Sequence, residues 1–203
     1  MNFLAHVFLS GNNKQLQVGN FIGDYVKGSA YKAYPTYIKQ GILLHRAIDD
    51  FTDRHPLAIE AKQPLQPLFR LYSGILVDMY YDHFLASQWQ QLSSTPLKRF
   101  TRRFYRAMVS NYRLLPARVK GFLPHLILSN RLSVYRTLQG LQSSLEIMEK
   151  YTSLPHKSKE AISLLKENYE WYKENFNQFF PELQLFVKEK LVEIENSVKT
   201  TEG

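Results

Sequence analysis

Apolar residues along this chain recur three and four positions apart, and prolines or glycines interrupt the pattern at intervals. This spacing places apolar side chains on one face of an α-helix, whereas a half-buried strand requires strict alternation of apolar and polar residues. No segment shows that strict alternation. The sequence therefore predicts an all-α fold, a single-domain bundle of several helices covering residues 1–203.

The interruptions predict where individual helices begin and end. Pro35 and the pair His55-Pro56 bound a helix over residues 36–54, because the residue before a proline disfavours helical backbone angles. Thr95 and Pro96 suit the cap and the first position of a helix that we expect to run to about residue 113. The other predicted helices cover 2–10, 14–27, 57–69, 71–90, 117–128, 130–151, 155–177 and a last segment that Pro181 begins, with residues 197–203 as a frayed tail.

Composition limits the kinds of site that the chain can build. The 203 residues fit one domain with a sizeable core, and 44% of them are apolar. There is no cysteine, which excludes disulfides, zinc–thiolate sites and thiol nucleophiles. Any bound metal must be held by histidine, carboxylate and carbonyl groups, which suit Mn, Mg, Fe or Zn. Because no run of about 18 apolar residues occurs, and the first residues lack a positively charged segment, we expect a cytoplasmic protein that does not cross a membrane.

The positive charge is concentrated in the middle of the chain. Residues 83–145 contain ten basic residues and no acidic one, whereas the rest of the chain has 16 basic and 18 acidic residues. A surface of one sign attracts molecules of the opposite charge. The asymmetry therefore points to an acidic partner, with proteins, nucleic acids and membrane surfaces as the candidates.

One predicted helix carries a histidine and two aspartates at a spacing of four residues. In the segment ILLHRAIDDFTDRHP these are His45, Asp49 and Asp53. Residues four apart on a helix differ by about 40° in direction, so the polar groups gather on one side and the apolar ones on the other. Aspartate is a poor helix former and is costly to bury without a partner, so this pattern requires an explanation.

The same kinds of residue recur in three further apolar segments. Asp78 and Asp82 are four apart in DMYYDHFL, with His83 next, while His6 and Asp24 lie in MNFLAH and GNFIGD. Taken singly, each aspartate has a structural explanation as a cap or ion-pair partner, and each histidine as a hydrogen-bonded core residue. Taken together, converging carboxylates would repel one another unless a divalent cation bound between them. The residues alone leave both interpretations open.

The segments MNFLAH, GNFIGD, GILLHRAIDDFTD and DMYYDHFL occur in this order within the first 85 residues, and together they resemble the acyl carrier protein phosphodiesterases. The resemblance implies an all-α relative of the HD phosphohydrolases, in which a divalent metal, typically Mn²⁺, with Mg²⁺ and Fe²⁺ as the other candidates, activates water against a phosphodiester. It implies hydrolysis of holo-acyl carrier protein to the apo-carrier and free 4′-phosphopantetheine. The doublet Asp82-His83 reverses the His-Asp order of that group.

The resemblance also implies roles for individual residues. His6 is expected to protonate the leaving serine oxygen or to orient the phosphate. Arg46 is expected to pair with a phosphate oxygen, and an ordinary ion pair with Asp49 or Asp50 is an equal alternative. Asp49 and Asp78 are expected to be further ligands or to hold the ligands in place. The catalytic candidates are thus His6, Arg46 and Asp49, and the metal-ligand candidates are Asp24, His45, Asp78, Asp82 and His83.

A basic stripe runs along the helix that follows Pro96, formed by Arg99, Arg102, Arg103 and Arg106. Acyl carrier proteins are small and strongly acidic, so the resemblance implies that this stripe docks the carrier. A solvated helix face is the alternative, although such a face normally mixes both signs. Nucleic acid is the other rival, because Tyr105, Tyr112 and Tyr135 lie among the arginines. No nucleic-acid-binding motif occurs, and we therefore favour the carrier protein.

Two other functions compete with the carrier hydrolase. One is a metal phosphohydrolase of the HD type that acts on a nucleotide or another small phosphoester. The other is a non-catalytic module whose basic segment binds a carrier protein, nucleic acid or lipid. The acidic segments fit both hydrolases, because the chemistry at phosphorus is the same in each. The basic stripe distinguishes the two, because a protein substrate would need it and a small phosphoester would not.

Overall fold

The chain folds into α-helices joined by short turns and 3-10 helices, and residues 1–202 contain no β-strand. The structure is a computed structural model that describes these residues, apart from the side chains of 197 and 199–202, and Gly203 lies outside it. The predicted all-α fold is confirmed. The α-helices are α1 (Phe3–Leu9), α2 (Lys14–Ile22), α3 (Thr36–Arg54), α4 (Pro56–Lys62), α5 (Gln66–Phe69), α6 (Ser73–Ser87), α7 (Trp89–Leu92), α8 (Leu97–Ser110), α9 (Ala117–Leu128), α10 (Arg131–Val134), α11 (Leu138–Tyr151), α12 (Ser158–Glu167) and α13 (Tyr169–Glu202).

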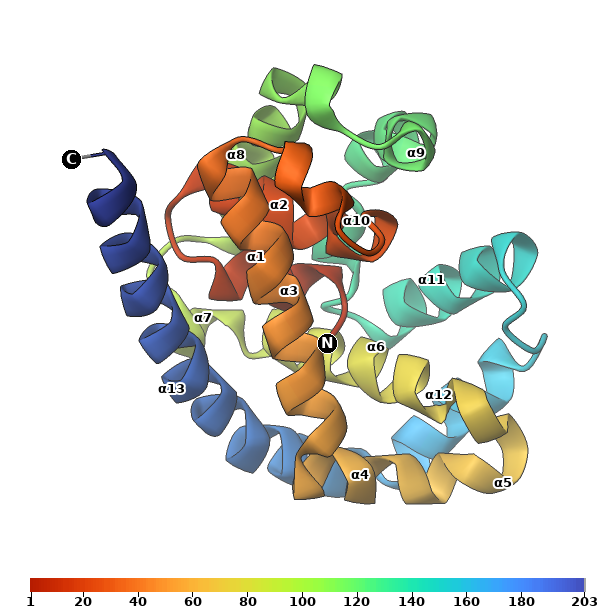
Figure 1. The fold of residues 1–203 in the computed structure, drawn as a ribbon. Helices are drawn as coiled ribbons and strands as arrows, with labels where there is room; N and C mark the ends of the chain where they lie inside the picture. Colours follow the sequence, from red (N-terminus) through yellow and green to blue (C-terminus); the bar gives the residue numbers. More distant parts are fainter. Residues whose placement is uncertain (203) are drawn as a thin grey trace.

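The helices share one hydrophobic core, in agreement with the predicted single domain. Its buried side chains come from the whole length of the chain, from Met1 and Leu4 near the start to Ile194 and Val198 near the end. Figure 1 shows α3 through the middle of the molecule, α8 and α9 together at one end, and α13 along one side. α13 packs against α3, α4 and α6, so the end of the chain covers helices from its first half.

Two glycines allow α2 and α3 to pack backbone against backbone. A Cβ atom at Gly19 would lie 2.1 Å from the carbonyl oxygen of Ile38, and one at Gly41 would lie 2.4 Å from that of Leu16. Only glycine leaves room for so close an approach. As a consequence, the end of α2 lies against the middle of α3, where the polar residues of both helices meet.

The end of the chain differs from the prediction. Pro181 was expected to begin the last helix, and instead it lies inside α13. A proline inside a helix costs about 3 kcal/mol, because it removes a hydrogen bond and clashes with the preceding turn. Phe179, Phe180 and Leu183 flank it and are fully or almost fully buried. Burial of each such side chain contributes about 1.5–3 kcal/mol, which together outweighs the cost of the proline.

Other helix boundaries also differ from the prediction. The predicted helix 155–177 is divided at Asn168, whose side chain donates to the Leu164 carbonyl and so ends α12. Pro96 is the cap of α8 and not its first residue, so Thr95 does not cap it. The predicted helix 130–151 is divided into α10 and α11, while the boundaries of α3 and α9 are as predicted.

α13 is the longest of the described helices, and it buries Leu183, Val187 and Ile194 at helical spacing. Neither α13 nor any other described helix is long and apolar enough to span a bilayer. α13 continues to Glu202, and Gly203 lies outside the described residues. The predicted fraying of residues 197–203 and the exact limits of the domain stay predictions.

Candidate metal centre

Two histidine rings from different helices stack at the centre of the candidate site. His6 of α1 and His45 of α3 have ring centroids 4.1 Å apart and planes inclined by 21°. Both side chains are buried. Gly23, directly after α2, makes room for the second ring, because a Cβ atom there would lie 2.2 Å from Cγ of His45. Two imidazoles held this closely can present their nitrogens to one common point.

Asn20 holds both imidazole rings in place. Its amide nitrogen donates to the carbonyl oxygen of His6 and to Oγ of Ser10, which fixes the orientation of the amide. Its side-chain oxygen then faces Nδ1 of His6 at 2.8 Å, and its main-chain oxygen faces Nδ1 of His45 at 2.8 Å. Because a carbonyl oxygen only accepts, Nδ1 of His45 carries a proton. Both rings are thus oriented with Nε2 toward Asp49.

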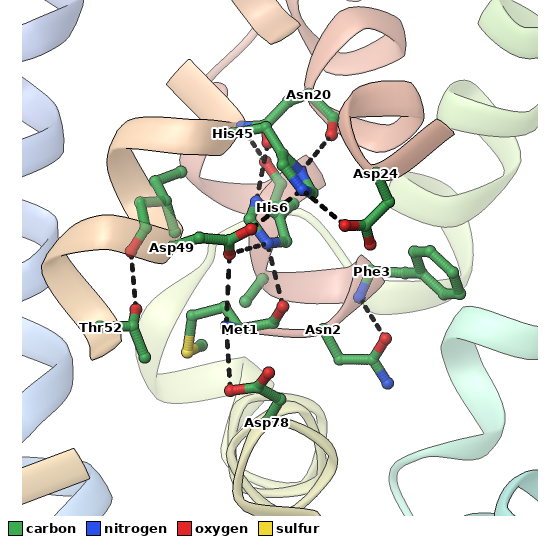
Figure 2. A network of polar contacts seen from close by, with 12 residues as sticks. Met1, Asn2, Phe3, His6, Asn20, Asp24, His45, Asp49, Thr52 and Asp78 are labelled. Carbon is green, nitrogen blue, oxygen red and sulfur yellow. Dashed lines mark hydrogen bonds and ion pairs between the residues drawn. The ribbon is translucent and has the colours of Figure 1, made fainter. Parts of the chain in front are cut away.

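Around these two nitrogens the structure gathers acceptors (Figure 2). Nε2 of His6 lies 3.2 Å from Oδ1 of Asp49 and 2.9 Å from the carbonyl oxygen of Met1. Nε2 of His45 lies 3.1 Å from Oδ2 of Asp49 and 3.3 Å from Oδ1 of Asp24. Neither contact of His45 has the geometry of a hydrogen bond, so this buried nitrogen has no hydrogen-bond partner within residues 1–202. The lone pairs of this nitrogen and of the carboxylate oxygens would repel one another, so a proton or a metal cation must lie between them.

The pKa values of the group show where a proton sits when no metal is bound. Burial lowers the pKa of His45, but the carboxylates of Asp24 and Asp49 outweigh it and raise that pKa to about 9. Burial together with the charge on His45 lowers the pKa of His6 to about 4. Burial opposes ionisation of Asp49, yet the two imidazoles hold its pKa well below the usual range. One proton on His45 thus takes the place of a cation, and a metal ion would compete with that proton.

The residues present fit a divalent metal ion. Within the described chain, His6, His45 and Asp49 form a group whose potential ligand atoms all lie within 4.8 Å of one another. Asp24 contacts the same group through His45 and is the most exposed of the four, with 60% of its side chain accessible. Two imidazole nitrogens with carboxylate oxygens are a donor set suited to Mn, Fe or Zn. The centre is open on the side of Asp24.

The motifs on these helices have counterparts in known proteins. The family model described as acyl carrier protein phosphodiesterase matches residues 1–183. The chain belongs to this family. Acyl carrier protein phosphodiesterases from an Enterobacter strain and from Klebsiella pneumoniae are 32% and 30% identical to it over 191 residues, which is 94% of this chain and 99% of each relative. The Yersinia pestis protein of the same description is 28% identical over 95% of this chain and its own whole length.

No solved structure matches the chain significantly. The expected likeness to the HD phosphohydrolases therefore stays a prediction. The structure brings four of the residues predicted for the site together, namely His6, Asp24, His45 and Asp49. The other predicted site residues have different partners.

Asp78 reaches the centre only through another group. Its carboxylate lies 3.0 Å from the α-amino group of Met1, which lies 3.8 Å from Asp49 on its other side. Burial raises the pKa of Asp78, and the amino group opposes this effect. Asp78 thus supports the position of Met1, whose carbonyl oxygen contacts His6. Of the two roles expected for Asp78, metal ligand or holder of the ligands, this contact favours the second, which stays a prediction.

The carboxylate of Asp82 binds main-chain amides of α1. Its two carboxylate oxygens accept hydrogen bonds from the amides of Leu4 and Ala5, at 2.8 and 3.0 Å, and the side chain is fully buried. These amides belong to the first turn of α1, where backbone N–H groups have no partner inside the helix. Asp82 therefore attaches α1 to α6 and satisfies two of its free donors. Burial raises the pKa of Asp82 to about 7 in spite of these bonds.

Asp82→Ala should lower the free energy of unfolding by about 2–6 kcal/mol, because it leaves two buried amides without an acceptor, at about 1–3 kcal/mol each. Urea denaturation measures this. Asp82→Asn keeps one acceptor, and its loss should be intermediate. Asp53→Ala is the control, since its exposed pair with Lys62 contributes about 1 kcal/mol or less. A stable Asp82→Ala protein would show that the cap is dispensable.

His83 and Arg46 have partners away from the centre. Nδ1 of His83 contacts the carbonyl oxygen of Tyr135 at 2.7 Å, and Nε2 contacts the hydroxyl of Tyr169 at 2.9 Å. Arg46 donates to the carbonyl oxygens of Val26 and Gly28, so it holds the loop that follows Asp24. Its guanidinium also lies 5.1 Å above the ring of Tyr31. Asp50, the other proposed partner of Arg46, pairs with Arg54 instead.

Asn20 and Gly23 were not among the residues predicted for the site. Both lie in the segment GNFIGD, together with Asp24, which was predicted. A glycine directly before a predicted ligand is a signal for close approach of another side chain, although it does not show which one. An asparagine in an apolar helix is a comparable signal, because its amide must find partners when buried.

Gly23→Ala should displace the His45 ring, because the added methyl group overlaps its Cβ and Cγ atoms. We expect a loss of about 1–3 kcal/mol in stability, as for overpacked cores, and a clear weakening of Mn²⁺ binding in a calorimetric titration. Gly121→Ala in α9 is the control, since nothing lies within 4 Å of its added methyl group. Equal Mn²⁺ affinity in both variants would contradict the assigned position of His45.

The basic stripe lies on the exposed side of α8. Its four arginines are all exposed, and none of them forms an ion pair with a described residue. Buried Phe104 on the opposite side of α8 contacts Phe21 of α2, at 5.1 Å between ring centroids. α8 therefore packs directly on the helix that leads to Asp24. The residues of the stripe are Arg99, Arg102, Arg103 and Arg106.

Proposed function

We propose that this protein is a metal-dependent phosphodiesterase that hydrolyses 4′-phosphopantetheine from holo-acyl carrier protein. The observation that carries the proposal is the convergence of Nε2 of His6 and Nε2 of His45 on the oxygens of Asp24 and Asp49, in a member of this family. The products are the apo-carrier and free 4′-phosphopantetheine.

The proposed ligands are His6, His45, Asp49 and Asp24, with Mn²⁺ as the favoured ion and Mg²⁺ or Fe²⁺ as the others. Imidazole ligands favour Mn²⁺ and Fe²⁺ over Mg²⁺, which prefers oxygen. His6 moves from the catalytic candidates to the ligands, because its lowered pKa keeps the ring neutral near neutral pH, and a neutral imidazole is a good metal ligand and a weak acid. Asp82 and His83 leave the ligand set because their polar atoms have partners elsewhere.

The chemistry follows from this assignment. A divalent metal bound there would lower the pKa of a coordinated water and neutralise charge on the phosphoryl group. Asn20 contacts Nδ1 of both rings through its side-chain and main-chain oxygens, and this orients both Nε2 atoms toward Asp49. In the overall reaction the bond between phosphorus and the serine oxygen breaks, the oxygen of water joins phosphorus, and a proton goes to the serine oxygen.

The open side of the centre also favours an anion. Arg118 of α9 lies 5.8 Å from the ring centroid of Tyr25, the neighbour of Asp24. Arg46 fixes the following turn by its bonds to Val26 and Gly28. We assign docking of the acidic carrier to the basic stripe on α8, which meets a partner of opposite charge without competing ion pairs of its own.

Mass spectrometry of holo-acyl carrier protein tests the proposal directly. The carrier is incubated with this protein and Mn²⁺, and a parallel sample contains EDTA. Loss of the prosthetic arm only in the presence of metal is the expected result. An unchanged carrier in a sample whose protein binds Mn²⁺ would overturn the assigned substrate, and absence of metal binding would overturn the assigned centre.

A further inference from the structure

A groove lies along one flank of α8, between this helix and the end of α9. Its volume is about 620 Å³, and its lining includes the basic side chains of Lys98, Arg102 and Arg106 and the apolar side chains of Val109 and Ile127. Residues 98 and 110 both line it. Twelve residues of helix rise about 18 Å, so the groove has the length of about three helical turns.

The lining of the groove combines accessible apolar side chains with basic ones that have no acidic partner. Val109 is 56% exposed, although it is apolar, and Ile127, which also lines the groove, is half-buried. Lys98, Arg102 and Arg106 form no ion pair with any residue that the structure describes. Exposed apolar groups bordered by charged ones are typical of protein interaction sites. The chemistry fits an acidic amphipathic helix with an apolar side chain directed at Val109 and Ile127.

Nucleic acid fits this surface less well, because the tyrosines near it are not available for stacking. Tyr105 is 6% exposed, and its hydroxyl accepts a hydrogen bond from the amide of Leu132. Tyr135 is 2% exposed, and its hydroxyl accepts one from Asn2. Of the three tyrosines in the basic segment only Tyr112 is exposed. Binding of a single strand normally uses a series of exposed aromatic rings.

The groove is connected to the metal centre by α9. Ile127 near the end of this helix lines the groove, and Arg118 near its start lies over Tyr25 beside Asp24. Nine residues of helix between them rise about 14 Å. A domain of about 100 residues has a radius of gyration of about 13 Å, so a partner of this size can contact both places at once.

We infer that the groove on the Arg102 and Arg106 flank of α8 receives an acidic helix of the acyl carrier protein, with one apolar side chain of that helix against Val109 and Ile127. The inference rests on the proposed function. It goes beyond charge attraction by the stripe, because it assigns one flank of α8 and an apolar contact. Arg103 lies on the other flank, in a smaller hollow with Lys14 and Phe8.

Val109→Glu tests the apolar contact, because it places a carboxylate in the groove, where it would face an acidic helix of the bound carrier. The matched control is Val192→Glu on α13, where a valine is 52% exposed. Binding of apo-acyl carrier protein, which carries no arm and is not turned over, is measured by calorimetry, together with the KM for holo-carrier. We expect Val109→Glu to weaken binding and raise KM by at least about tenfold, and Val192→Glu to leave both unchanged.

Circular dichroism and urea denaturation verify that both variants are folded. Unchanged binding by Val109→Glu, or an equal loss in both variants, would overturn the inference. A single-stranded oligodeoxynucleotide serves as a competitor in the same assay. The inference would also be overturned if this oligodeoxynucleotide displaced the carrier from the wild-type protein and bound equally well to the Val109→Glu variant. Failure of the proposed function is distinct from these results, because it appears as absence of hydrolysis by the wild-type protein.

Discussion

Replacing Asp49 by asparagine should abolish tight Mn²⁺ binding and lower kcat/KM for holo-acyl carrier protein by at least about 100-fold. Even outer partners of metal ligands typically contribute 10- to 100-fold, and Asp49 contacts both imidazole nitrogens directly, at 3.1 and 3.2 Å. The substitution keeps the shape of the side chain but removes its negative charge. It also replaces one carboxylate oxygen by an NH₂ group, which is not a metal ligand. Calorimetric titration with Mn²⁺ and steady-state kinetics measure the two effects.

The neighbouring Asp50→Asn is the control for this substitution. Asp50 lies on the same helical turn, but its exposed carboxylate pairs with Arg54 at 2.7 Å and does not face the centre. We expect normal metal affinity and turnover in this variant, since exposed pairs of this kind contribute little to stability. If Asp49→Asn retained wild-type Mn²⁺ affinity while remaining folded, the assigned metal centre would be wrong.

Reversing three charges of the stripe, Arg99, Arg102 and Arg103 to glutamate, should lower kcat/KM for holo-acyl carrier protein by about 100- to 1000-fold. This is the range by which electrostatic attraction accelerates association of proteins. Hydrolysis of a small phosphodiester such as bis(p-nitrophenyl) phosphate should change little, because α8 lies outside the metal centre. Wild-type kcat/KM should also fall with increasing salt, and that of the triple variant should not.

A variant of equal net charge separates docking from a general charge effect. Lys159, Lys166 and Lys188 are exposed on α12 and α13, and their replacement by glutamate alters the total charge by the same amount. We expect this variant to hydrolyse the carrier at a rate close to that of the wild-type protein. Equal losses in the two triple variants would show that net charge matters and that the stripe is no specific docking surface.

Local sequence determined much of the fold. The all-α class and the limits of α3 depend on helical spacing and on prolines, which act within a few residues. For the same reason the pairing of His45 with Asp49 was predictable: side chains four apart on one helix are neighbours whatever surrounds them. Asp24 also stood out in the sequence, as a carboxylate in an apolar segment, and the family resemblance added the expected chemistry and roles for individual residues.

Contacts between distant segments decided the rest. Asp82 and His83 have nearly the same local sequence setting as the residues of the centre. The carboxylate of Asp82, however, accepts from two amides in the first turn of α1, and Tyr135 and Tyr169 bind the ring of His83. Pro181 was expected to begin a helix, but the aromatic side chains around it are buried against other helices. In each case a partner far along the chain supplies more free energy than the local preference.

The sequence by itself therefore determined that this protein is helical, that α3 presents a histidine and a carboxylate on one side, and that its basic residues gather in one segment. Only the tertiary structure decided which histidine stacks on His45, how Asn20 directs both rings, and which flank of α8 borders an apolar groove. The physical reason is that helical spacing fixes the direction of a side chain relative to its own helix, whereas the packing of helices determines what that side chain meets.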